Sequence, residues 1–101
     1  MKINITARKF KARDTLKEFI EAEVSSLEKF SDEITSVEVI LSFQNSKDSI
    51  KSAEIVAKIP KQILSATEES DDFQKSVSIA VEKIARQLKK VKTKKRPVRE
   101  K

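Results

Sequence analysis

Four basic residues near the C-terminal end repeat at spacings that place them along one line of a helix. They are Lys83, Arg86, Lys90 and Lys94, separated by three, four and four residues. Residues three or four apart are neighbours on a helical surface, and a rise of about 1.5 Å per residue makes this ridge about 16 Å long. Such a row of cations can bind successive phosphates of a nucleic acid. The simpler interpretation is a solvated helix face.

Other basic residues extend this candidate polyanion site. Lys75, Lys89 and Lys92 belong to the same stretch, and Arg8, Lys9 and Lys11 follow an alternating segment at the start of the chain. A positive loop after a strand is a common phosphate contact, although it can also be a solvated loop with Phe10 in the core.

The charge of the chain is concentrated in one region. Residues 83–101 contain ten lysines or arginines and one glutamate, so they carry +9, while the other 82 residues carry −3 of the net charge of +6. This distribution describes a nearly neutral domain with a strongly basic C-terminal end. It favours a polyanionic partner but does not specify a sequence.

The composition argues against an enzyme. The chain has no His, no Cys and no Gly, which excludes a histidine general base, the usual zinc sites and glycine-rich phosphate loops. The densest acidic cluster is Glu68, Glu69, Asp71 and Asp72. We interpret it as a turn and a helix N-terminus, and we expect no catalytic residue, metal, cofactor or small-molecule substrate.

No feature of the sequence indicates a membrane or an exported protein. No apolar run reaches the length of a membrane span, and the first ten residues, MKINITARKF, alternate like a strand and lack a signal-peptide core. We therefore expect a cytoplasmic location.

The basic ridge requires a long amphipathic helix, predicted over residues 70–94. Its apolar residues fall within one arc at about 100° per residue; they are Phe73, Val77, Ala80, Val81, Ile84, Leu88 and Val91. Asp71 and Asp72 are expected in its first turn, after a cap at Ser70 or Asp71. Ile79 projects toward the basic side, either as a surface apolar residue or as a partner contact.

Alternation and helical spacing predict the remaining elements. Strands are expected at residues 2–7, 36–43, 51–59 and 62–68, and a helix at residues 14–29. The order β-α-β-β-β-α predicts an α+β fold: a four-stranded mixed sheet with two helices packed on one face. We expect the domain to span residues 1–92, followed by a basic, disordered tail at residues 93–101.

Several stretches resemble the ribosome hibernation-promoting factors. These stretches are INITARKF, SLEKF, SVEVILSF and ILSATEESDDFQKSVSIAVEKIARQLKKVK. The sharpest part is Asp71-Asp72-Phe73, followed fifteen residues later by Leu88. The family includes the ribosome-associated inhibitor, or cold-shock protein Y, and was long described as sigma-54 modulation protein. The resemblance covers roughly residues 1–95 and is to the short form, without the C-terminal domain that pairs two ribosomes; the N-terminal domain of a longer protein is the alternative.

The resemblance implies a fold similar to double-stranded RNA-binding domains and a ribosome-bound location. It implies binding to 16S rRNA of the small ribosomal subunit near the decoding centre, by a protein that is a monomer off the ribosome. There it would overlap messenger RNA and A- and P-site transfer RNA and inhibit translation in stationary phase or stress. The matching basic positions would contact phosphates; they are Arg8, Lys29, Lys83, Arg86, Lys89, Lys90 and Lys92. From their place on the helix, we interpret Lys83, Arg86 and Lys90 as solvated in the free protein.

The chain departs from the family pattern at three positions. Ala7 and Lys61 stand where the family commonly has glycine, and Gln74 stands where an aromatic residue is usual. From composition alone, a general double-stranded RNA-binding module remains an alternative. A protein–protein adaptor that modulates a sigma factor, with the basic face against an acidic protein surface, is another.

Overall fold

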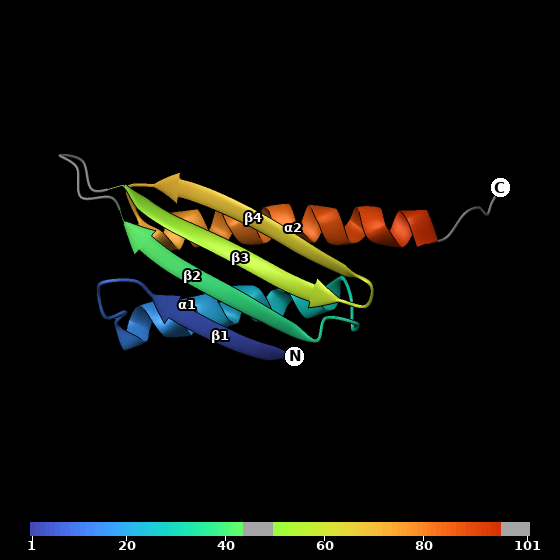
Figure 1. Cartoon of the computed structure of the whole chain (residues 1–101), viewed down its shortest axis with the longest axis horizontal. Coiled ribbons are helices and arrows are strands. Elements are labelled where there is room, and N and C mark those ends of the chain that lie inside the picture. Colours follow the sequence, from blue (N-terminus) through green and yellow to red (C-terminus); the bar gives the residue numbers. More distant parts are fainter. Residues whose placement is uncertain (44–49, 96–101) are drawn as a thin grey trace.

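The computed structural model describes residues 1–43 and 50–95, with the backbone alone for residues 92–95. The described elements follow the chain in an order that Figure 1 shows. They are β1 (Lys2–Ala7), α1 (Asp14–Ser25), a short 3-10 helix η1 (Ser26–Lys29), β2 (Ser36–Phe43), β3 (Lys51–Ile59), β4 (Gln62–Ser70) and α2 (Phe73–Lys95).

The strands form one mixed sheet in the order β1-β2-β3-β4. The first two strands are parallel, and the other pairs are antiparallel. Both helices lie on the same side of this sheet: α2 packs on β3 and β4, and α1 packs beside α2 and on β1 (Figure 1). The predicted α+β class, element order and two-layer arrangement are confirmed.

The core lies between the sheet and the helices because each strand alternates in burial. Val39 of β2 pairs with Ile55 of β3, and both side chains are completely buried. The helix α2 contributes the other half of the core through its apolar arc, in which Ile84 is completely buried and Leu88 nearly so. Each such side chain contributes about 1.5–3 kcal/mol when it leaves water, so the amphipathic pattern of α2 fixes which side of the helix faces the sheet.

The start of α2 differs from the prediction. The strand β4 extends to Ser70 and α2 begins at Phe73, so Asp71 and Asp72 precede the helix instead of forming its first turn. The amide of Asp72 donates to Ser70 Oγ at 3.2 Å, and the Asp72 carbonyl accepts from the Ser76 amide at 3.0 Å. A short hydroxyl side chain that bonds the backbone two residues on competes with helix formation, which delays the helix past both aspartates.

The buried hydroxyl of Ser76 ties the first turn of α2 to the sheet. It donates to the Lys51 carbonyl at 2.8 Å and lies 2.7 Å from Ser70 Oγ. Both contacts satisfy a polar group that is completely buried, as a buried hydroxyl requires.

The other boundaries lie close to their predicted positions. The predicted helix over residues 14–29 is an α-helix to Ser25 and a 3-10 helix to Lys29. The helix α2 continues to Lys95, beyond the predicted domain end at Lys92. Residues 96–101 of the predicted tail, and the polar turn at residues 44–49, lie outside the described residues.

The hairpin between β3 and β4 turns at Pro60 and Lys61, between the paired residues Ile59 and Gln62. Lys61 has φ 68°, the left-handed region that a type II turn requires after its proline. A residue with a side chain pays about 1–2 kcal/mol there, so the turn geometry that glycine favours is kept without glycine.

Replacing Lys61 with glycine should therefore stabilise the fold. We expect Lys61→Gly to raise the free energy of unfolding by up to about 1 kcal/mol. Glycine removes the steric cost of the left-handed backbone, and this gain exceeds the cost of the extra conformational entropy that glycine loses on folding. Urea denaturation followed by circular dichroism measures this. The matched variant Lys58→Gly, inside β3, should instead lose about 0.5–1 kcal/mol, and a loss in both variants would contradict the interpretation.

Candidate nucleic-acid interface

The basic loop between β1 and α1 is one of two places where predicted cations gather. Arg8, Lys9 and Lys11 are all exposed there. The Arg8 amide donates to the Leu41 carbonyl of β2 at 2.9 Å, which holds the start of the loop against the sheet. Lys9 has φ 66° and turns the chain toward α1, while Phe10 packs inward and stacks on Phe73 with ring centroids 5.1 Å apart. The sequence therefore folds so that the loop's aromatic residue is anchored and its cations face solvent.

Lys75 lies near the N-terminal end of α2, on the same end of the molecule as this loop (Figure 1). Its Nζ is 3.4 Å from Asp71 Oδ1, and both side chains are well exposed. An exposed pair of this kind contributes little to stability, so Lys75 can exchange Asp71 for another anion at low cost.

The remaining described cations of α2 have different partners. Arg86 Nη2 is 3.9 Å from Glu82 Oε2, one helical turn away on a solvated face. Lys89 Nζ lies 5.1 Å from the centroid of the Phe30 ring, a cation–π distance. Lys90 is exposed, and so is Lys29 in η1. Lys92 and Lys94 lie in the last turns of α2, where side chains are outside the described atoms.

Lys83 is exposed, with 48% of its side chain accessible, but its charge already has a partner within the protein. Its ammonium forms an ion pair with the Glu68 carboxylate of β4, and the Glu68 side chain is only 18% exposed. Glu68 follows Leu64 and Ala66 on the side of β4 that faces α2, because strand residues two apart share a face. A carboxylate at an inward position needs a cationic partner on the covering helix, and this alternation is the signal that could have identified the pair.

Reversing the charge of the Lys83 side chain should therefore lower the stability of the folded protein. We expect Lys83→Glu to lower the free energy of unfolding by about 1–3 kcal/mol, between the values for exposed and buried pairs, because two carboxylates would then share a half-buried site. The double exchange Lys83→Glu with Glu68→Lys should recover most of the loss. Arg86→Glu is the matched control on an exposed pair and should change stability by less than about 1 kcal/mol. Equal losses in the two single variants, measured by urea denaturation, would contradict this assignment.

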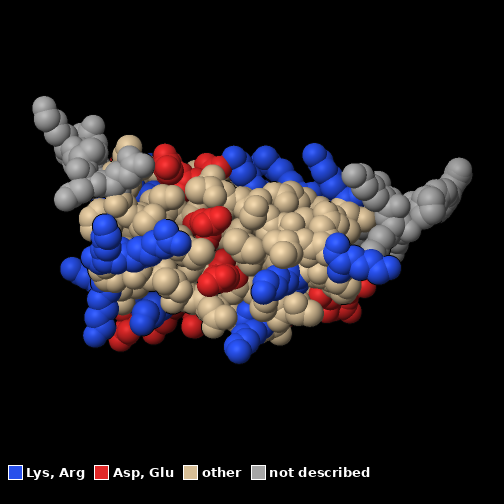
Figure 2. Space-filling view, viewed as in Figure 1, with Lys and Arg blue, Asp and Glu red and all other residues tan. Residues whose placement is uncertain are grey.

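Some predicted cations make no ion pair with another described residue. They are Arg8, Lys9, Lys11, Lys29 and Lys90. Their charges can bind phosphates without breaking an internal contact. Figure 2 shows Lys and Arg side chains at the end of the molecule that holds the basic loop and along the edge where α2 and β4 lie.

The uncovered face of the sheet is less suited to a polyanion. Glu38 of β2 and Glu54 of β3 occupy outward positions, and acidic side chains lie in the middle of this face in Figure 2. The exposed Ile63 of β4 also points away from the helices. The acidic side chains at the centre of this face are less favourable for phosphates than the cations of the basic loop and of α2.

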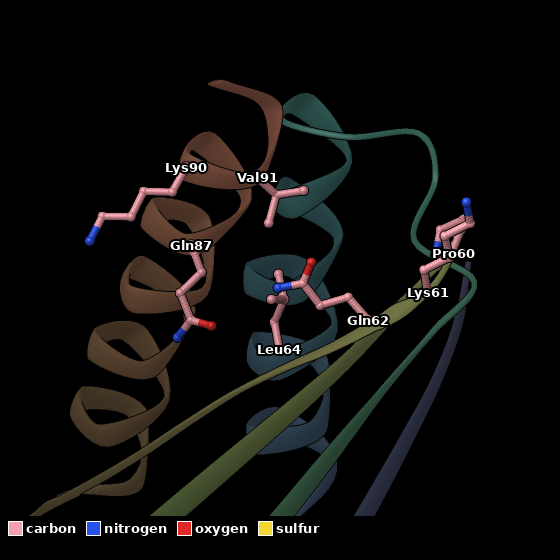
Figure 3. A pocket seen from close by; sticks show the side chains of 7 residues that line it. All are labelled: Pro60, Lys61, Gln62, Leu64, Gln87, Lys90 and Val91. Carbon is pink, nitrogen blue, oxygen red and sulfur yellow. The ribbon is translucent and has the colours of Figure 1, made fainter. Parts of the chain in front are cut away.

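Two hollows flank α2. One, of about 440 Å³, lies between the β3–β4 turn and the C-terminal half of α2, with Lys61 and Lys90 among its lining residues (Figure 3). The other, of about 400 Å³, lies between α1 and α2 and has Ile79 among its lining residues. Ile79 is half-buried there, which leaves both predicted interpretations of this residue open.

Within residues 1–43 and 50–95, no group of three or more metal-ligating side chains converges. The helices of the same part of the chain lack the apolar length needed to cross a membrane. The described surface therefore offers basic side chains and the two hollows beside α2 as possible binding features.

Comparison with known proteins connects this surface to a family. Residues 3–96 match the family described as Sigma 54 modulation protein / S30EA ribosomal protein. This chain belongs to that family. The match includes the basic residues of the candidate interface, and it confirms both the resemblance found in the sequence and the expectation that the chain is not an enzyme.

Individual relatives agree with the family. A protein of Azotobacter vinelandii described as ribosome hibernation promoting factor is 31% identical over 94 residues, which are 93% of this chain and 85% of that protein. A ribosomal subunit interface protein from Coxiella burnetii has a TM-score of 0.82 at 28% identity, over 92% of this chain and 99% of that one. The N-terminal domain of Thermus thermophilus Protein Y has the same fold, with a TM-score of 0.79 at 24% identity over 90% of this chain and 99% of that one.

Proposed function

We propose that this protein is a ribosome hibernation factor that binds the small ribosomal subunit through 16S rRNA and inhibits translation. The proposed site is the channel near the decoding centre that holds messenger RNA and A- and P-site transfer RNA. The protein would act in stationary phase or stress, as a ribosome-associated cytoplasmic protein that is a monomer when free. The observation that carries the proposal is family membership over residues 3–96, the segment that contains the cations of the proposed interface.

The distribution of charge supports RNA as the partner. Arg8, Lys9 and Lys11 lie at one end of the molecule, while Lys29 and Lys90 lie on the helical layer, and none of them is neutralised by another described residue. Each can replace a counterion on a phosphate, so affinity should fall steeply as salt rises. We propose that Lys75, Arg86 and Lys89 add contacts after exchanging their internal partners, as do Lys92 and Lys94 at the end of α2.

Lys83 takes a different part in this proposal. Its ion pair with Glu68 holds α2 on β4, so we assign it first to positioning the helix that carries the other cations. It remains half-exposed, with 48% of its side chain accessible, and its ammonium can add a phosphate contact without leaving Glu68 because it has three donors.

Cosedimentation with purified ribosomal subunits tests the proposal. We expect near-stoichiometric binding to the small subunit, competition by initiator transfer RNA, and inhibition of a cell-free translation reaction at the same protein concentrations. Equally strong binding to free duplex RNA would instead favour a general double-stranded RNA-binding module. Failure to sediment with the small subunit at low salt would refute the proposal.

A further inference from the structure

The hollow between the β3–β4 turn and α2, which we call the turn groove, combines apolar, amide and cationic groups. Leu64 of β4 and Val91 of α2 line it from two elements, and Pro60 adds a third apolar surface. In Figure 3, the side chains of Gln62 and Gln87 lie between Lys61 on one side and Lys90 on the other. Its volume of about 440 Å³ is within the range of small-ligand sites.

We propose that the turn groove binds a single unstacked nucleotide of RNA. The base would lie against the aliphatic side chains of Leu64 and Val91, and its edge would meet the amides of Gln62 and Gln87. The flanking phosphates would bind the ammonium groups of Lys61 and Lys90. This inference rests on the proposed function, because the bound nucleotide would belong to the ribosomal RNA that the protein is proposed to bind.

The two glutamines present the polar atoms that a base edge requires. Gln87 Nε2 donates to the Ser65 carbonyl of β4 at 2.9 Å, which fixes the amide and leaves its oxygen as an acceptor. The side-chain amide of Gln62 makes no hydrogen bond to another described residue, so it offers both donor and acceptor groups. Recognition of splayed-out bases through their edges is the usual mode of single-stranded RNA binding.

Lys61 adds a positive charge to the lining of the turn groove. Its left-handed backbone is unfavourable for any residue with a side chain, and glycine would fit the same turn, yet the position carries an ammonium group. No carboxylate lines the turn groove among the described residues, whereas Glu23 and Glu82 line the hollow between α1 and α2. Charge therefore directs a phosphate to the turn groove and away from the other hollow.

Continuity with the proposed RNA interface supports the same occupant. Lys90 lies on the wall of the turn groove and also belongs to the cations of α2. An RNA strand that follows α2 would pass the mouth of the groove, so one nucleotide can enter while its neighbours stay on the helix surface.

A nuclear magnetic resonance titration of the full chain with adenosine and uridine 5′-monophosphate tests this inference. We expect shifts of the Gln62 and Gln87 side-chain amide signals, and about tenfold weaker binding of ribose 5-phosphate, which lacks the base. Lys61→Gly and Gln62→Leu should each weaken nucleotide binding about tenfold, while Lys58→Gly on the opposite face of the sheet should not. Because Lys61→Gly is expected to be more stable than the natural chain, weaker binding by this variant cannot come from unfolding.

Three results would overturn the inference. Equal binding of ribose 5-phosphate and the nucleotides would show a phosphate site without base recognition. Shifts confined to other residues would place the nucleotide elsewhere, and stronger binding of an acidic peptide to the same amides would identify a protein partner. Small-subunit cosedimentation of the same variants separates this inference from the proposed function: a natural chain that sediments with the subunit but fails the titration refutes only the groove.

Discussion

Replacing Ile84 with aspartate should unfold the protein at room temperature. Ile84 is completely buried in the middle of α2, against the sheet. The variant loses the burial of a large aliphatic side chain, about 2–5 kcal/mol, and places an unpaired carboxylate in the core, which costs several kcal/mol more. The sum reaches the total stability of about 5–15 kcal/mol typical of a domain of this size. Far-UV circular dichroism and a nitrogen–proton correlation spectrum would show loss of helix and of dispersed amide signals.

The chain supplies a matched control for this variant in Ile63. Its side chain is 62% exposed on the uncovered face of β4, so Ile63→Asp makes the same chemical change in water. We expect it to alter the free energy of unfolding by less than about 1 kcal/mol. If Ile84→Asp still unfolds cooperatively with a loss below about 2 kcal/mol, the apolar arc of α2 is not the main contact with the sheet.

Ile63 and Ile84 also show why the fold could be predicted. Ile84 belongs to a 3.6-residue apolar period and Ile63 to a two-residue alternation, and each period states directly which side of an element is buried. The four strands and two helices were found because these periods persist over the length of each element. The start of α2 was misplaced because the competing hydrogen bonds of Ser70 depend on where β4 ends, which a periodicity does not encode.

The candidate site was only partly predictable for a related reason. The exposed basic residues could be identified from their types and spacing. The pairing of Lys83 with Glu68 joins residues on two elements, and the stacking of Lys89 on Phe30 joins residues 59 positions apart. The turn groove likewise arises from the juxtaposition of the β3–β4 turn and α2, so no local spacing indicates it.

These contacts change which cations give the clearest test of the proposed function. Reversing Lys83 would disturb the packing of α2, and reversing Arg86 also removes a pair with Glu82. Lys11, Lys29 and Lys90 are exposed and make no ion pair with another described residue. They sample the basic loop, the end of η1 and the ridge of α2, so their combined reversal tests the whole proposed interface with little effect on the fold.

We expect the triple variant Lys11→Glu, Lys29→Glu and Lys90→Glu to bind the small ribosomal subunit at least about a thousandfold more weakly. Each charge-assisted hydrogen bond to a phosphate contributes about 1.5–3 kcal/mol, and each introduced carboxylate adds repulsion. The salt dependence should weaken as well, by roughly one unit of the logarithmic slope for each phosphate that the variant no longer neutralises. Filter binding or cosedimentation at several salt concentrations measures both quantities, and urea denaturation should show a change below about 1 kcal/mol.

A second triple variant separates the site from the net charge. Lys2, Lys17 and Lys58 are exposed on β1, α1 and β3 and lie outside the proposed interface. Reversing these three lysines to glutamate changes the net charge by the same amount as the first variant. If RNA is bound at the basic loop, the end of η1 and the ridge of α2, this control should bind more tightly than the first variant, because it removes no cation that is assigned to a phosphate. Equally weak binding by the two variants would mean that overall charge attracts the protein to the ribosome and that these particular cations do not form the interface.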